Sequence, residues 1–283
     1  MATAGNHLRQ MTTSQLLNGL QIDRISSESG KTELRLCPST TAEMRVEARS
    51  AITDRPECRK LNPVINVPDS MVQLKLEDDI SSGGFIAGMT MQNSSSIDYL
   101  EQREAVSTDD SKIITAFHDP RHQLVVEQHL EATEVEGTLR AWTTLTNHGD
   151  QAVSLELLTS FVISGITPFV DNDASGRLKV HRFRSWWSNE GRLCSESLED
   201  LHLERNWCGF NTVSERFGQV GTMPVRKYFP FVAIEDCQAG VIWGAQLAHP
   251  GSWQMEITRR GDSVSISGGL ADFEFGHWKK ALA

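Results

Sequence analysis

The stretch Trp186-Trp187-Ser188-Asn189-Glu190-Gly191-Arg192-Leu193 places two adjacent tryptophans beside several planar hydrogen-bonding groups. Aromatic faces stack on sugar rings, and nearby polar side chains fix the orientation of a bound sugar. Adjacent residues of a strand point to opposite faces, so we expect one tryptophan to be core and the other accessible. Because the polar residues follow Trp187, we predict that Trp187 is accessible and Trp186 is buried. The composition fits a carbohydrate contact surface and an anchor at a domain interface equally well.

Carboxylates that are close together in sequence are a second source of chemistry. The pairs are Glu199 with Asp200, Glu235 with Asp236, and Asp272 with Glu274. Glycoside hydrolysis needs two carboxyl groups about 5–10 Å apart across a sugar, and adjacency in sequence does not establish such a gap. We therefore interpret the three pairs as solvated surface groups.

Two histidines, His118 and His122, have a spacing that suits metal ligands on a helix. The intervening Asp119-Pro120 and the flanking strand patterns instead predict a hairpin turn. The glycine-rich phosphate loops and the G-x-S-x-G nucleophile motif are missing from the sequence. We expect no metal and no cofactor.

The elements that position these residues follow a period of two, which is typical of strands. Apolar and polar residues alternate in Trp253–Thr258 and again in Val264–Ser267, and Gly261-Asp262 between them suits a two-residue turn. A second hairpin is predicted from Leu139–Leu145 through the turn Asn147–Asp150 to Val153–Leu157. Further strands are predicted at Thr32–Leu36, Ala42–Ala48, Met71–Leu76, Ile113–Phe117, Leu124–Glu131, Val180–Arg184, Phe231–Glu235 and Val241–Gln246.

About a dozen strands with short turns predict an all-β fold of stacked antiparallel sheets. Strands do not alternate with amphipathic helices, which argues against a Rossmann fold or a (β/α)8 barrel. The one helix candidate is Ser197–Glu204, where Ser197 and Asp200 could cap an end, although its leucines also suit an irregular loop. The length of 283 residues fits one large all-β domain.

Charge and composition exclude several classes of function. The formal net charge is −10, which disfavours binding to the phosphates of a nucleic acid. Met1–Gln10 lacks an apolar signal region, and Cys237–Met255, the longest uncharged stretch, carries proline, glycine and glutamine, so no membrane span is expected. The five cysteines are odd in number and lack a C-x-x-C motif, which favours a reducing, cytoplasmic location.

Several runs resemble the N-terminal domain of bacterial α-galactosidases of glycoside hydrolase family 36. They are Val180–Leu193, Glu204–Trp207, Ser214–Gly218, Tyr228–Phe231, Trp243–Leu247, Pro250–Trp253, Gly268–Leu270 and Phe275–Trp278. The resemblance extends from about Leu76 to Trp278. It implies a two-layer antiparallel β-supersandwich, similar to the galactose mutarotase fold, over residues 31–278. Residues 1–30 remain poorly assigned, and residues 279–283 are expected to begin a linker.

In that family the domain precedes a catalytic (β/α)8 barrel, whose aspartate nucleophile lies in a Lys-Trp-Asp motif. This sequence has no Lys-Trp-Asp, and Trp278-Lys279-Lys280 does not replace it. The resemblance therefore implies a non-catalytic domain of a retaining α-galactosidase that packs on the barrel, shapes access of an α-galactoside and builds a homo-oligomer. No catalytic residue is predicted. The residues expected at the interface or substrate rim are Trp187, Glu190, Trp207, Arg216, Arg226 and Tyr228.

Two other classes of function stay open. A free-standing carbohydrate-binding module would bind a sugar without turning it over. A mutarotase-type enzyme would need a general acid and a general base on either side of the ring oxygen, for which His181, His202 and Glu190 are available.

Overall fold

The chain is an all-β protein in the computed structural model, as the sequence predicts. The structure describes residues 11–26, 32–38, 70–77, 101–102, 106–109, 111–166, 176–204, 212–221, 223, 225–260, 263–271 and 280–282. These residues contain strands and turns but no helix, so none of them forms a helix that could cross a membrane.

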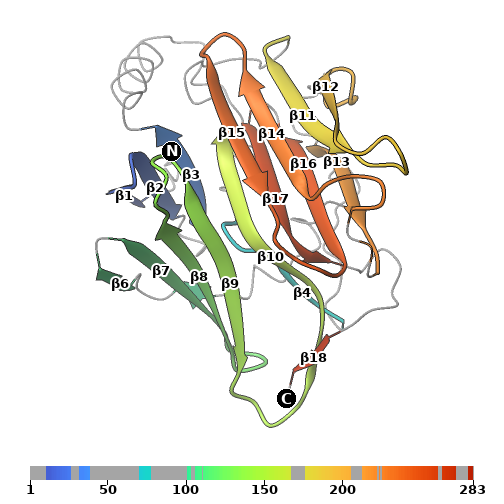
Figure 1. The fold of residues 1–283 in the computed structure, drawn as a ribbon. Coiled ribbons are helices and arrows are strands. Elements are labelled where there is room, and N and C mark those ends of the chain that lie inside the picture. Colours follow the sequence, from blue (N-terminus) through green and yellow to red (C-terminus); the bar gives the residue numbers. More distant parts are fainter. Residues whose placement is uncertain are drawn as a thin grey trace, which may run out of the picture.

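Within the described residues the strands form three sheets, and the largest has nine strands in the order β1-β2-β3-β10-β17-β16-β13, with β4 and β18 also paired to β10 (Figure 1). Its strands are β1 (Met11–Leu17), β2 (Leu20–Ser26), β3 (Thr32–Pro38), β4 (Leu74–Leu76), β10 (Val153–Ile166), β13 (Thr212–Gln219), β16 (Trp253–Arg260), β17 (Ser263–Ala271) and β18 (Lys280–Leu282). All pairs in this sheet are antiparallel except the short parallel contact of Ser164 on β10 with Arg35 on β3.

Two smaller sheets complete the fold. The four-stranded sheet has the order β12-β11-β14-β15, and the five-stranded sheet has the order β5-β7-β8-β9 with β6 paired to β7. Their strands are β11 (Leu178–Arg184), β12 (Arg192–Ser197), β14 (Phe231–Asp236), β15 (Val241–Gln246), β5 (Glu101–Gln102), β6 (Val106–Asp109), β7 (Lys112–Asp119), β8 (Leu124–Ala132) and β9 (Leu139–Asn147).

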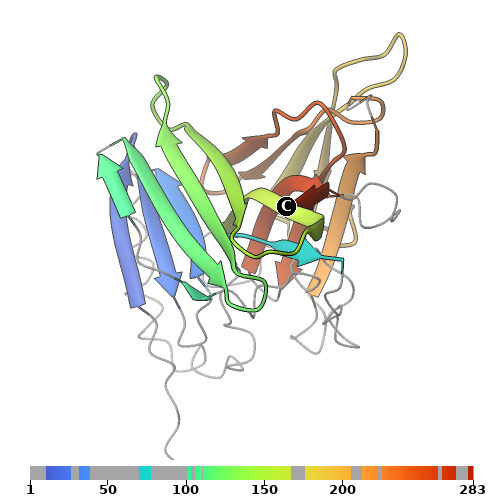
Figure 2. The ribbon, with the colours of Figure 1, turned by 90° about the horizontal axis from the view of Figure 1, so that it is seen from below.

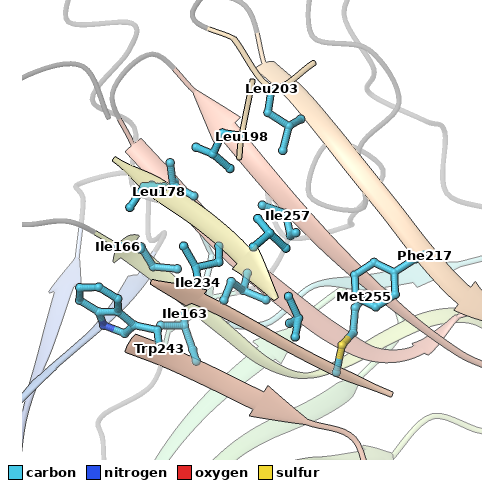
Figure 3. Packing of buried hydrophobic residues seen from close by; sticks show 14 of the residues in the cluster. Ile163, Ile166, Leu178, Leu198, Leu203, Phe217, Ile234, Trp243, Met255 and Ile257 are labelled. Carbon is cyan, nitrogen blue, oxygen red and sulfur yellow. The ribbon is translucent and has the colours of Figure 1, made fainter. Parts of the chain in front are cut away.

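Two hydrophobic clusters join the smaller sheets to the large one. Phe217, Met255 and Ile257 of the large sheet face Ile234 and Trp243 of the four-stranded sheet (Figure 3). The second cluster includes Phe117 and Val126 of the five-stranded sheet with Ile22, Leu34 and Leu74 of the large sheet. The large sheet therefore forms one layer and packs against both smaller sheets, which form the other layer. This is the arrangement expected for a supersandwich.

The two predicted hairpins have different outcomes. Pairing of Arg260 with Ser263 leaves Gly261-Asp262 between β16 and β17, which confirms the first hairpin. The second is wrong: β9 pairs only with β8 among the described strands, whereas β10 lies in the nine-stranded sheet. The segment 148–152 carries the chain from one layer to the other (Figure 2).

A local signal explains that second error. Asn147 accepts a hydrogen bond from the amide of Gly149 and donates one to the carbonyl of Gln151, at 2.9 and 2.8 Å. Such turn chemistry reverses the chain equally well within a sheet or between two sheets. The alternating apolar residues before and after the turn can be buried in both arrangements, because each strand has one face toward the core.

The helix candidate at Ser197–Glu204 forms a turn. The backbone amide of Ser197 donates to the Asp200 carboxylate and the amide of Asp200 donates to the Ser197 hydroxyl, both at 3.0 Å. This reciprocal pair is a capping box, but His202 takes a positive φ of 56° and ends the turn at once. Leu198 and Leu203 are buried, so packing decides the conformation here.

The sheet also extends past both predicted domain boundaries. The strands β1 and β2 lie before residue 31, and β18 lies after residue 278, and all three pair with other strands of the nine-stranded sheet. The predicted strand Ala42–Ala48 lies outside the described residues.

Candidate functional site

The Trp186-Trp187 pair lies in the loop between β11 and β12, which extends beyond the strand ends (Figure 2). Trp187 is 93 % exposed, which confirms the prediction for this residue. Trp186 is 53 % exposed, so its predicted burial is wrong. The reason is that β11 ends at Arg184, and the alternation of faces applies only within a strand.

Backbone hydrogen bonds hold this loop in shape. The amide of Asn189 donates to the carbonyl of Trp186 at 2.8 Å, and the amide of Ser188 donates to the Glu190 carboxylate at 3.0 Å. Ser188 and Gly191 adopt positive φ values of 62° and 73°. Glu190, a predicted rim residue, is exposed and at the same time fixes the loop.

A second segment lies alongside. The amide of Ser185 donates to the carbonyl of Lys227 at 3.0 Å, and the amide of Phe229 donates to the carbonyl of Phe183 at 2.9 Å. This pairing brings the exposed Met223 (64 %) and Val225 (40 %) to the same end of the four-stranded sheet as the tryptophan loop. We call the exposed apolar set Trp186, Trp187, Met223 and Val225 the aromatic corner.

Four cationic residues belong to the same segments as the aromatic corner. Arg192, Arg226 and Lys227 are exposed, and Arg184 is half-buried. The chain as a whole carries a net charge of −10, so this end of the molecule contrasts with the rest. A surface that combines exposed aromatic rings with arginines has the composition of a protein interface or of a ligand platform.

A buried arginine lies beneath the corner. Arg182 donates to Glu215 at 2.9 Å and to Glu196 at 2.6 Å, and its guanidinium lies 5.2 Å from the Phe217 ring and 5.3 Å from the Tyr228 ring. Burial alone would lower the pKa of Arg182, but the hydrogen bonds that Arg182 donates to Glu196 and Glu215 outweigh burial and raise the pKa. The charge is therefore permanent and compensated.

The predicted rim residues have four different outcomes. Trp187, Glu190 and Arg226 are exposed at the loops around the corner. Tyr228 is only 8 % exposed and packs against Phe217, so its ring belongs to the core below. Trp207 lies outside the described residues.

Arg216, the remaining rim candidate, lies on β13 in the large sheet. Its Nε is 3.8 Å from the carboxylate of the fully buried Glu256, and its side chain is 22 % exposed. Its role at an interface or substrate rim stays a prediction, like that of the other candidates.

Sequence reasoning missed Met223, Val225 and Lys227 as members of this surface. Their separation from the tryptophans in sequence hides the fact that the two segments lie side by side, which depends on the bridge between Arg184 and Tyr228. The available signal was two apolar residues, Met223 and Val225, next to the cations Arg226 and Lys227 in a segment with proline.

Other predicted chemistry is structural. His122 hydrogen-bonds the buried Asp119 at 2.8 Å in the β7–β8 turn, which confirms the hairpin. Asp236 is also fully buried, where it pairs with Arg177, so its interpretation as a solvated group is wrong. Among the residues that the structure describes, no cluster of three or more His, Cys, Asp or Glu side chains could hold a metal ion.

Solved structures with a similar fold come from α-galactosidases, although no family model and no curated protein sequence matches the chain. The family 36 α-galactosidase AgaA from Geobacillus stearothermophilus, solved in complex with 1-deoxygalactonojirimycin, is 12 % identical, with a TM-score of 0.59 over 96 % of this chain. The galactosidase domain of the α-galactosidase-sucrose kinase AgaSK is 11 % identical, with a TM-score of 0.61 over 97 % of this chain.

This chain covers 38 % of the first of those chains and 40 % of the second. A putative aldose 1-epimerase from Escherichia coli K12 reaches a TM-score of 0.45 at 10 % identity, over 97 % of this chain and 94 % of that chain, too low to carry an argument. The likeness to the two α-galactosidases shows a shared fold.

Proposed function

We propose that this chain is the non-catalytic β-supersandwich domain of a retaining α-galactosidase of glycoside hydrolase family 36, and that it packs on a catalytic (β/α)8 barrel. The observation that carries the proposal is the fold shared over nearly the whole chain with two α-galactosidases, of which it spans only about 40 %. In this role it shapes access of an α-galactoside to the barrel and contributes to a homo-oligomer.

The aromatic corner supports this role. Trp187 at 93 % and Met223 at 64 % exposure are large apolar side chains, and exposed sets of this kind mark interaction surfaces. Tryptophan and arginine are the residues enriched at the energetic centre of interfaces. Arg226 beside the corner therefore adds specificity to the apolar contact.

Sedimentation velocity at increasing protein concentration tests the corner as an interface. We expect self-association through the corner, which the double change Trp186→Ala and Trp187→Ala weakens by about 30-fold or more, because a single tryptophan at the centre of an interface contributes about 2 kcal/mol. Ile242→Ala is the matched control, since Ile242 is 61 % exposed on β15. A protein that stays monomeric at every concentration, or an equal effect of Ile242→Ala, would contradict the proposal.

An activity assay tests the non-catalytic character. We expect the purified chain to leave a chromogenic α-galactoside intact, since the Lys-Trp-Asp motif is missing from its sequence. Turnover that Glu190→Gln abolishes would overturn the proposal.

A carbohydrate-binding module is the second candidate, favoured by the near-complete exposure of Trp187 beside Asn189 and Glu190. Tryptophan fluorescence during titration with melibiose tests it. A saturable change that Trp187→Ala removes would support sugar binding at the loop, and an identical response of wild type and variant would exclude it.

A further inference from the structure

The outward face of the four-stranded sheet carries a second group of polar side chains, apart from the aromatic corner. His181 on β11 lies opposite Ser195 on β12 and opposite Ala233 on β14. Glu235 follows two residues after Ala233 and so lies on the same face. The strand register therefore places a hydroxyl, an imidazole and a carboxylate side by side.

Hydrogen bonds connect the three side chains in a row, with His181 in the middle. His181 Nδ1 is 2.8 Å from Ser195 Oγ, and His181 Nε2 is 3.1 Å from Glu235 Oε2. An ionised carboxylate only accepts hydrogen bonds, so Nε2 carries the ring proton and Nδ1 is an acceptor. Ser195 must then donate its hydroxyl proton to Nδ1.

This is the connectivity of a nucleophile, a general base and a group that orients the base. The two ring nitrogens are exchanged relative to the serine protease arrangement, but each group has the same role. Glu235 fixes the tautomer and compensates the imidazolium that forms when His181 takes the proton. Ser195 is exposed, so its hydroxyl is accessible to a small molecule.

The surroundings indicate which molecules could react. Phe183 lies two residues from His181 and pairs with Leu193, which is 54 % exposed, and the Phe183 ring is 5.3 Å from that of Phe231. These side chains form an apolar platform beside the hydroxyl. Lys179, exposed two residues before His181, places a positive charge on the same face, where it can stabilise a developing oxyanion.

We propose that Ser195 is an activated nucleophile that accepts acyl groups from aryl or alkyl esters. Ser195 Oγ attacks the ester carbonyl carbon while its proton moves to His181 Nδ1. The bond from the carbonyl carbon to the leaving oxygen then breaks, and the leaving alcohol takes that proton from His181. An acyl-Ser195 ester remains, which water hydrolyses to the carboxylic acid with His181 again as base. This proposal does not depend on the proposed α-galactosidase role, in which the domain is non-catalytic toward α-galactosides.

The test is acylation with p-nitrophenyl acetate. The release of p-nitrophenolate measures the reaction, and peptide mapping locates the acetyl group. We expect a burst close to one equivalent and an acetyl group on Ser195. His181→Gln should slow acylation by about 100-fold or more, because a general base contributes about 10²–10⁴-fold. Glu235→Gln, which keeps the shape and loses the charge, should slow it by a smaller factor.

Ser197→Ala is the matched control, because Ser197 lies two residues further along the same strand and its hydroxyl accepts a hydrogen bond from Asp200 instead of contacting a histidine. It should leave the burst unchanged, whereas Ser195→Ala should abolish it. Labelling with a serine-directed fluorophosphonate gives a second readout, because this reagent does not react with lysines. Acetyl groups spread over lysines, an unlabelled Ser195, or equal labelling in His181→Gln would each overturn the proposal.

Discussion

The aromatic corner and the layer beneath it contain the same residue types in opposite physical states. Beneath, the guanidinium of Arg182 lies beside the rings of Phe217 and Tyr228, and its charge is compensated by Glu196 and Glu215. At the corner, Trp187 and Arg226 are exposed. Arginine and aromatic rings therefore stabilise this fold where they are buried together and stay available for contacts where the strand has ended.

The difference has a physical basis in desolvation. Burying a charge costs several kcal/mol unless hydrogen bonds replace its hydration. Arg182 makes such hydrogen bonds with two carboxylates. Arg226 has no such need, because it remains hydrated. Substitutions below the corner should therefore act on stability, and substitutions at the corner should act on association.

The largest effect is expected for Trp253→Ala in the buried layer. Trp253 is 1 % exposed and contacts Phe217 edge to face, at 6.0 Å between ring centroids. Its removal leaves a large cavity, so the free energy of unfolding should fall by about 3–5 kcal/mol. Urea unfolding followed by circular dichroism measures it. A loss under about 1 kcal/mol would show that the layer is not tightly packed.

The next effect is expected for Arg182→Met. It removes two charged hydrogen bonds while keeping most of the side-chain volume, so the free energy of unfolding should fall by about 2–3 kcal/mol. Glu196 and Glu215 are partly exposed at 29 and 33 %, so water can replace some of the lost contact. Arg192→Met on the neighbouring strand β12 is the matched control and should be nearly neutral. Equal losses in the two variants would remove the contrast between buried and exposed arginines.

A smaller, pH-dependent effect is expected at His129, an outer-face residue that is nevertheless buried. His129 stacks on Trp142 at 4.8 Å, and burial, with the nearby Lys112, lowers the pKa of His129 below the ordinary value of a histidine. The unfolded chain therefore binds a proton more readily than the folded chain. Stability from this site is fully present above the ordinary histidine pKa and is lost as the pH falls toward the folded pKa.

Unfolding midpoints measured from neutral to mildly acidic pH check this sign. His129→Phe keeps an aromatic stack and should reduce the loss of stability on acidification, whereas His148→Phe at an exposed turn should not. If both variants follow the wild-type pH profile, the buried His129 does not cause the loss of stability on acidification.

The smallest effect on stability is expected for Trp187→Ala. A side chain that is 93 % exposed contributes little to packing, so the free energy of unfolding should change by no more than about 0.5 kcal/mol. Trp186→Ala should cost somewhat more at 53 % exposure, but far less than Trp253→Ala. Thermal unfolding of the three variants ranks them, and a large loss for Trp187→Ala would place its ring in the core.

Local patterns predicted much of the fold correctly. The predicted strand Val241–Gln246 matches β15 residue for residue, and the pattern around Gly261-Asp262 predicts the β16–β17 hairpin. These signals work because side chains of a strand alternate between faces, and because a two-residue turn has few permitted sequences. The exposed Trp187 was predictable for a related reason, since the residues that follow it are polar.

Other features depend on which layer a strand joins. The turn at Asn147–Asp150 looks the same in sequence whether β10 pairs with β9 or crosses to the other layer, as it does here. Asp236 and Glu235 are chemically alike, but β14 turns the first toward Arg177 in the core and the second toward His181 on the outer face.

The sequence by itself determined the all-β class, most of the strands and the exposed polar loop after Trp187, because these follow from short-range periodicity and turn chemistry. Only the tertiary structure decided that Met223 and Val225 join the tryptophans at one corner, that Arg182 is buried with two carboxylates, and that Ser195, His181 and Glu235 meet on one face. Each of these arrangements depends on how strands and loops pair in three dimensions, as when β11 pairs with β12 on one side and with β14 on the other. The free energy that selects such pairing comes from burying whole sheet faces against one another, which no local segment encodes.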